Sequence, residues 1–290
     1  MRFFVWYPFR WLLRGIPVSL SFLLFQLAGN LHFFIGGKKR DKISSTIKTF
    51  LDSSEGTARD ITKKYFRVHY IDRLHIFLYP KLTDLKRLRE FVYFENVEVL
   101  DRVLRDGRGA LIVQPHFGPV QITLLALALS GYDPVQIGYP SDKGLSKVGR
   151  SIAFRQRIKY EKMLPAPILS ADGYLGKAYK HLKKGGVVLT TGDGAGGGVF
   201  IGEQKNFKFL SIERLFPLGP AAWATKTGAA FIPTFIIPEG YKRFRIVFEN
   251  PIGDATNKKK NAVHLTEKFI ALAESYIRAY PHCWHFWDEI

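Results

Sequence analysis

The stretch of sequence that decides the fold is ALIVQPHFGPVQITLLALAL, residues 110–129. Its first four residues form an apolar run typical of a buried strand, and its last eight form a nearly all-apolar run that stops before Gly131, as a buried helix does. Between them, Pro119 fits the first helical position because proline has no backbone N–H to lose there. The sequence therefore predicts a strand, a short loop that contains His116, and a helix over residues 119–129.

This corner between strand and helix is suited to acid–base chemistry. We expect His116 just before the helix, Gly118 at its cap and Gln121 as its third residue. Residues five apart on a continuous helix point about 140° away from each other, so His116 can meet Gln121 only from the loop. There His116 can act as a general base that Gln121 orients, and the free N–H groups around Gly118 offer a site for developing negative charge. The alternative is that Gln121 only closes a capping box and that His116 is an ordinary core or surface residue.

Beyond this corner, strand-like and helix-like segments alternate along the chain. Strand-like runs occur at 92–94, 110–113, 134–138, 168–169, 187–191, 230–237 and 244–248. Helical patterns occur at 54–79, 97–105, 119–129, 146–163, 173–184, 217–227 and 261–280. This alternation predicts an α/β fold, with a mixed central sheet flanked by helices. We expect one catalytic domain over residues 43–290.

The first 42 residues predict an N-terminal membrane-anchoring helix with a basic flank. Residues 16–35 are largely apolar and carry no formal charge, and their number is close to what a helix needs to cross the hydrocarbon core. Gln26, Asn30 and His32 interrupt the run. Aromatic and basic residues precede it, and the basic cluster KKRDK follows at 38–42, which predicts that the following domain is cytoplasmic. The alternative is the buried first helix of a soluble domain.

Composition limits the choice of partners. The 290 residues, 47% of them hydrophobic, can form a sizeable core, and the formal net charge of +18 attracts polyanions. Such partners include an anionic membrane, a phosphorylated substrate or nucleic acid, but no nucleic-acid-binding motif supports the last. The single cysteine, Cys283, excludes an intrachain disulfide and fits a reducing compartment.

Two further groups of residues are candidates for substrate binding. Arg155, Arg157 and Lys159 belong to a basic helix on which Arg155 and Lys159, four apart, share a face and can hold a phosphate. The alternative is a solvated cationic face. Asp193 lies in TTGDGAGGG, residues 190–198, at the end of a buried strand, where substrate ligands are common. This glycine-rich loop matches neither a phosphate-binding loop nor a dinucleotide fingerprint, so its glycines are best explained by tight turns.

The aromatic C-terminus predicts packing or an interfacial anchor rather than a metal site. His282, Cys283, His285 and Asp288 cluster there, but their spacing matches no standard zinc pattern. We therefore expect no metal and no cofactor.

Taken together, these blocks resemble the lysophospholipid acyltransferase superfamily, in particular the lipid A late (lauroyl/myristoyl) acyltransferases. The similarity begins at the N-terminus and covers most of the chain. Its sharpest points are His116-Phe117-Gly118 after a strand and Asp193 after an apolar strand. Weaker points are Arg155 in the basic helix, residues 224–233 and the aromatic C-terminus.

The resemblance implies transfer of a fatty acyl chain from a thioester, on acyl carrier protein or coenzyme A, to a hydroxyl of a lipid or glycolipid such as a lipid A precursor. His116 would be the general base, and basic residues near Arg155 would hold acceptor phosphates. A thioester already has a good leaving group, so no metal or cofactor is implied. The implied location is the bacterial inner membrane, with the catalytic domain on the cytoplasmic side.

The chain departs from the family at Gln121, where the family has Asp or Glu. An amide can fix the tautomer of the imidazole but cannot stabilise the imidazolium as a carboxylate does, although His–Asn pairs do support catalysis in cysteine proteases. Three hypotheses remain open. The protein is an active enzyme with an altered dyad, to which Asp193 or another acid contributes in space; or an enzyme on an unusual acceptor, such as an amine; or a catalytically inactive lipid-binding or assembly protein that keeps the fold.

Overall fold

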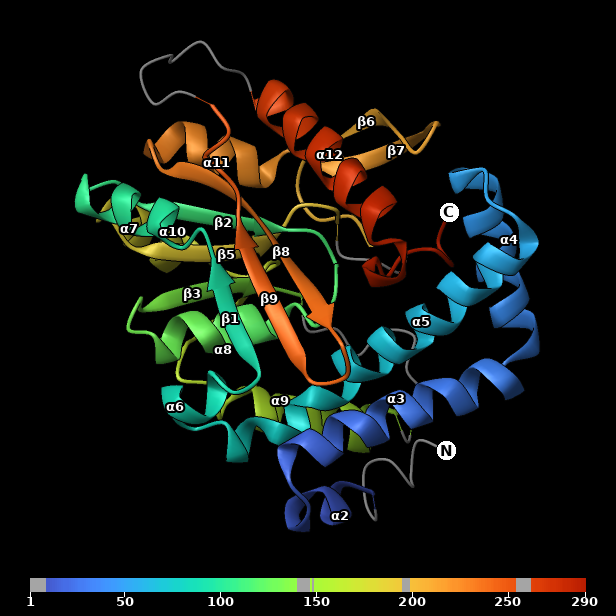
Figure 1. Cartoon of the computed structure of the whole chain (residues 1–290). Helices are drawn as coiled ribbons and strands as arrows, with labels where there is room; N and C mark the ends of the chain where they lie inside the picture. The colour runs from blue at the N-terminus through green and yellow to red at the C-terminus, as the bar shows by residue number, and fades with distance from the viewer. Residues whose placement is uncertain (1–8, 140–146, 148, 195–198, 254–261) are drawn as a thin grey trace.

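The computed structural model of the chain describes residues 9–139, 147, 149–194, 199–253 and 262–290 (Figure 1). The strands of its main sheet are β1 (Val92–Glu95), β2 (Ala110–Gln114), β3 (Pro134–Gly138), β4 (Ile168–Ser170), β5 (Val187–Thr191), β8 (Ala230–Glu239) and β9 (Arg243–Phe248). They lie in the order β1-β9-β8-β2-β5-β3-β4. Neighbouring strands are parallel except for the antiparallel pair β8–β9. The predicted mixed α/β sheet is therefore confirmed.

Helices cover both faces of this sheet, which is why its central strands are apolar along their whole length. In β2, Leu111 and Val113 belong to one hydrophobic core, and Ala110 and Ile112 belong to the other. The first core includes side chains of α10 (Gly176–Lys183), α11 (Gly219–Thr227) and α12 (Ala262–Ala279). The second includes side chains of α7 (Glu98–Arg105) and α8 (Gln121–Leu129).

The N-terminal helices lie together at one side of the sheet (Figure 1). They are α2 (Arg10–Gly15), α3 (Val18–Ile35), α4 (Gly37–Leu51) and α5 (Glu55–Leu74), followed by a 3₁₀ segment (His75–Lys81) and α6 (Leu85–Leu88). Ser54 caps α5, because its hydroxyl accepts a hydrogen bond from the Thr57 N–H. Helix α3 packs closely along α5, since a Cβ at Gly29 would lie only 2.6 Å from the Phe66 carbonyl oxygen.

Helix α3 is the one described helix long and apolar enough to cross a membrane. One face is buried in the protein and includes Phe22, Phe25 and Gly29. The opposite face is an exposed apolar surface, here called the α3 stripe: Leu20, Leu23, Leu27, Leu31, Phe34 and Ile35, each 40–64% exposed. Two of the polar residues that interrupt the apolar run bind the rest of the protein, because Gln26 donates to the Tyr241 carbonyl and Asn30 accepts from Arg67.

Three local predictions differ from the structure. Helix α8 begins at Gln121 rather than Pro119, because residues 117 and 118 are hydrogen-bonded to a distant part of the chain. The predicted basic helix is a π-helical turn (Gly149–Phe154) followed by α9 (Arg155–Glu161), and its predicted start at residue 146 lies outside the described residues.

The third difference is a hairpin that sequence reasoning missed. It consists of β6 (Gln204–Phe209) and β7 (Ile212–Pro217). Its two-residue turn is Leu210-Ser211, with φ of 48° and 70°. Hairpin turns with both residues at positive φ usually contain Asn or Gly, so this sequence carried no turn signal.

Candidate active site

The register of two neighbouring parallel strands brings His116 and Asp193 together. Strands β2 and β5 end at the paired residues Gln114 and Thr191, and the Gly192 N–H continues the ladder by donating to the Gln114 carbonyl. His116 and Asp193 each follow their strand end by two residues. Both side chains therefore lie at the carboxyl edge of the sheet, where open α/β sheets bind ligands.

The two side chains form a short hydrogen-bonded pair. His116 Nδ1 lies 2.7 Å from Asp193 Oδ1. The carboxylate only accepts hydrogen bonds, so Nδ1 carries the proton and Nε2 of a neutral imidazole is left as an acceptor. The His116 side chain is 24% exposed, whereas that of Asp193 is 3% exposed. The imidazole of His116 is therefore partly accessible to solvent, whereas the carboxylate of Asp193 is buried.

Asp193 is held by three donors. Besides the ring of His116, the backbone N–H of His116 donates to Oδ2 at 2.8 Å and the indole N–H of Trp284 donates to Oδ2 at 3.2 Å. Burial acts to raise the pKa of Asp193, but the charge of His116 and these hydrogen bonds hold it below its ordinary value. Burial likewise acts to lower the pKa of His116, and the Asp193 carboxylate raises it above the ordinary value instead.

Residues 283–286, here called the C-terminal clamp, fix the loop that carries His116. Phe117 and Trp284 form an antiparallel bridge. The Gly118 N–H donates to the Cys283 carbonyl, and the His285 N–H donates to the His116 carbonyl. The His285 ring adds a hydrogen bond from Nε2 to the Gly118 carbonyl at 2.7 Å. The loop is thus bound on both sides, by β5 through Asp193 and by the clamp.

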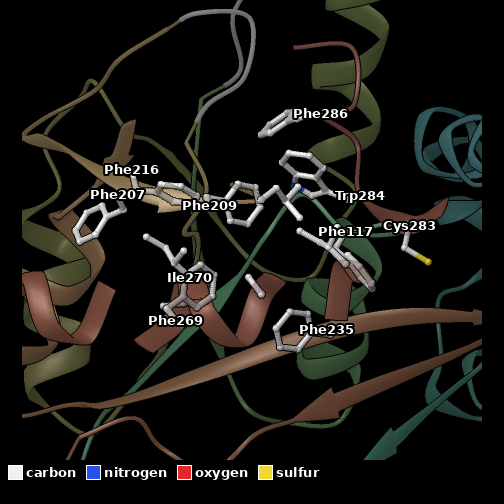
Figure 2. Close-up of a cluster of buried hydrophobic side chains, with 14 of the residues drawn as sticks. Phe117, Phe207, Phe209, Phe216, Phe235, Phe269, Ile270, Cys283, Trp284 and Phe286 are labelled. Atoms are coloured by element: carbon white, nitrogen blue, oxygen red, sulfur yellow. The ribbon is translucent and has the colours of Figure 1, made fainter. Parts of the chain in front are cut away.

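Aromatic packing supports the clamp. Trp284 is completely buried and lies beside Phe209 of the β6–β7 hairpin, with ring centroids 5.3 Å apart (Figure 2). The ring of Phe286 lies 4.6 Å from that of His116. The sequence predicted packing or an interfacial anchor for the aromatic C-terminus, but no signal tied Trp284 or His285 to His116.

Gly118 occupies a position that only glycine fits. Its φ is +65°, and a Cβ would collide with the Ile236 carbonyl oxygen. Its N–H, the donor expected to face a developing negative charge, is already engaged by the Cys283 carbonyl.

Gln121 makes its hydrogen bonds away from His116. Its carbonyl oxygen accepts from the Tyr79 hydroxyl at 3.0 Å, and its amide nitrogen donates to Glu161 at 2.8 Å. The same oxygen of Glu161 accepts from Arg157 at 2.7 Å. The pairing of Gln121 with His116 that the five-residue spacing suggested is therefore replaced by the pairing of Asp193 with His116. Gln121 instead connects the start of α8 to α9.

The three basic candidates lie on α9 with exposed side chains. Arg157 is paired with Glu161, whereas Arg155 and Lys159 are one helical turn apart on a common face, as predicted. The described residues contain no group of three or more His, Cys, Asp or Glu side chains able to hold a metal ion. Cys283 is buried, and burial raises the pKa of its thiol.

The site therefore contains a histidine and a buried carboxylate that fixes its tautomer, and Gln121 connects the following helix to the basic helix α9 through Glu161. A search of curated proteins finds no significant match. A family model does match, over residues 2–288, and its description is bacterial lipid A biosynthesis acyltransferase. Because this match covers nearly the whole chain, the protein belongs to the bacterial lipid A biosynthesis acyltransferase family.

Proposed function

We propose that the protein transfers a fatty acyl chain from an acyl thioester, on acyl carrier protein or coenzyme A, to a hydroxyl of a lipid A precursor or a related glycolipid. The observation that carries this proposal is the His116–Asp193 pair, with 2.7 Å between Nδ1 and Oδ1. It supplies a carboxylate to the histidine in a chain that has Gln121 where the family has an acid. This favours the active enzyme over the inactive lipid-binding protein.

The chemistry follows from the tautomer. Nε2 of His116 takes the proton of the acceptor hydroxyl as its oxygen attacks the thioester carbonyl. The imidazolium that forms is stabilised by the adjacent Asp193 carboxylate. When the tetrahedral intermediate collapses, the carbon–sulfur bond breaks and the proton passes from Nε2 to the leaving thiolate. The products are an ester and a free thiol, and His116 returns to its neutral form.

The proposed place of this reaction is the cytoplasmic face of the bacterial inner membrane. We assign membrane contact to the α3 stripe, because its opposite face is already packed against the protein. A helix held in this way lies along the membrane surface, and its exposed leucines and phenylalanine enter the boundary between headgroups and acyl chains. Trp11, 61% exposed and in contact with the Arg14 guanidinium, suits the same interface.

The substitution His116→Ala tests the catalytic assignment. We expect acyl transfer by the purified protein to fall by about 10²–10⁴-fold, the usual contribution of a general base. Mass spectrometry of the lipid product measures the transfer, and circular dichroism and thermal unfolding verify the fold. His264→Ala, which removes an exposed histidine on α12, is the matched control.

Two outcomes would argue against the proposal. Turnover retained in His116→Ala would exclude His116 as the base. Absence of turnover by the wild-type protein with both acyl carrier protein and coenzyme A donors would favour the inactive lipid-binding protein.

A further inference from the structure

Arg214 lies beside the His116–Asp193 pair without being part of it. This residue of β7 places its guanidinium carbon 5.4 Å from the centre of the Trp284 ring and 5.3 Å from that of Phe286. The same two rings contact the catalytic pair, since Trp284 donates to Asp193 and Phe286 packs on His116. The aromatic residues of the clamp therefore hold a cation next to the base.

The charge of Arg214 has no ionic partner among the described residues. Some arginines elsewhere in the structure pair with carboxylates, as Arg157 does with Glu161 and Arg278 with Glu274. Arg214 is half-buried, and its side chain makes neither an ion pair nor a hydrogen bond within the described part of the chain. Burial lowers the pKa of its guanidinium, an effect that Asp193 and Glu289 oppose only from a distance. A partly desolvated, unpaired cation is unfavourable unless an anion arrives to balance it.

The geometry selects the kind of anion. A guanidinium stacked on aromatic rings keeps its edge available, and that edge presents N–H donors in a planar fork that matches a phosphate or a carboxylate. Both substrate classes of the proposed reaction offer phosphate: the acceptor through its phosphorylated headgroup, and the donor through the phosphate of its pantetheine arm. We infer that Arg214 binds a phosphate group of a substrate and so brings that substrate to His116, an inference that rests on the proposed function.

A kinetic comparison tests this role and identifies the substrate. In Arg214→Ala we expect the KM of either the donor or the acceptor to rise about tenfold to hundredfold, the usual worth of a charge-assisted hydrogen bond, with little change in kcat. Arg214→Lys keeps the charge but loses the fork, so we expect an intermediate KM. Lys208→Ala removes an exposed cation from the same hairpin and is the matched control. A fall in kcat with both KM values unchanged would overturn the inference.

A binding measurement that needs no turnover separates this inference from the proposed function. Isothermal titration calorimetry with inorganic phosphate, at constant ionic strength, is expected to show binding by the wild type and Lys208→Ala that is lost in Arg214→Ala. Equal binding by the wild type and Arg214→Ala would refute a phosphate site at Arg214, whether or not the protein is active. Arg214→Lys with a native circular dichroism spectrum guards against misfolding of the alanine variant.

Discussion

At the scale of single residues, the hydrogen bonds of Asp193 determine which ring nitrogen of His116 carries the proton. Oδ2 faces two groups that can only donate, the His116 backbone N–H and the Trp284 indole. Oδ1 is left for the imidazole, which must then be protonated at Nδ1. Nε2 is consequently unprotonated in the neutral ring, which is the state that a general base requires.

Asp193→Asn is expected to disrupt this arrangement, because an amide cannot accept at both positions. If its NH₂ group faces the His116 backbone N–H and the Trp284 indole, donors face each other. If it faces His116 Nδ1 instead, Nδ1 must accept, and the imidazole proton moves to Nε2. We expect kcat/KM of the Asp193→Asn variant to fall about 10²–10⁴-fold. In the wild type, we expect kcat/KM to rise with pH as the imidazolium loses its proton, at a pKa that Asp193 raises above 6.5. Without the carboxylate, this inflection moves to lower pH.

The pH–rate profile of both proteins measures this shift. Asp60→Asn, at an exposed position on α5, is the control and is expected to behave as the wild type. An unchanged inflection in Asp193→Asn would show that Asp193 does not set the pKa of His116.

Gln121→Glu, which introduces the acidic residue that the family resemblance implies at this position, is expected to destabilise this protein. Its new carboxylate lies within hydrogen-bonding distance of Glu161, so one of the two must hold a proton and its pKa rises. A carboxyl whose pKa is raised on folding binds more protons in the native state, so stability falls as pH rises. We expect a loss of about 1–3 kcal/mol at pH 8 and a smaller loss at pH 5.

Thermal or urea unfolding at the two pH values measures this loss. Adding Glu161→Gln removes the repulsion, and the double variant is expected to recover most of the stability. A single variant as stable as the wild type at pH 8 would contradict the network of Gln121 and Glu161.

Sequence reasoning identified His116 and Asp193 separately and gave their contact in space only as one of several hypotheses. Each was recognised because it follows an apolar strand, a local signal. Their contact depends on β2 and β5 being neighbours in register, and pairing between strands so far apart in the chain leaves no local trace. Gln121 was predicted to orient His116 because it is near in sequence. The residue that contacts the His116 ring is Asp193, which lies 77 residues away in the chain.

At the scale of elements, α3 is a helix with two apolar faces that have different surroundings. One face packs on α5 so closely that Gly29 admits no side chain, and the other is the α3 stripe. Hydropathy detects both faces together and therefore predicts a spanning helix. The hydrogen bonds of Gln26 and Asn30 to the protein body, which distinguish the faces, involve Tyr241 and Arg67 and could not be predicted locally.

Replacing Leu27 and Leu31 by serine in one variant is expected to weaken membrane binding without harming the fold. Each side chain is more than half exposed, so its loss removes contact with lipid rather than with the core. We expect sedimentation with anionic vesicles to fall roughly tenfold or more and thermal stability to stay the same. Tyr174→Ser, which removes another exposed apolar side chain, is the control. Unchanged vesicle binding would exclude the α3 stripe as the contact surface.

At the scale of the whole molecule, the net positive charge supports the proposed binding to an anionic membrane. The chain carries 43 Lys and Arg residues against 25 Asp and Glu. Basic residues near an anionic leaflet each add about 1 kcal/mol of attraction. The excess would therefore strengthen the membrane contact proposed for the α3 stripe, and it would favour substrates that carry phosphate.

The C-terminal clamp has a consequence for how the protein is made. His285 and Gly118, which it joins, are 167 residues apart. A ribosome adds roughly 5–20 residues per second, so the loop of His116 leaves the exit tunnel on the order of ten seconds before the residues that hold it. During that interval Asp193 lacks the Trp284 hydrogen bond and His116 lacks its Phe286 neighbour. The strands that carry His116 and Asp193 are therefore synthesised well before the clamp that fixes their geometry, and we expect a product truncated before residue 283 to lack acyl-transfer activity.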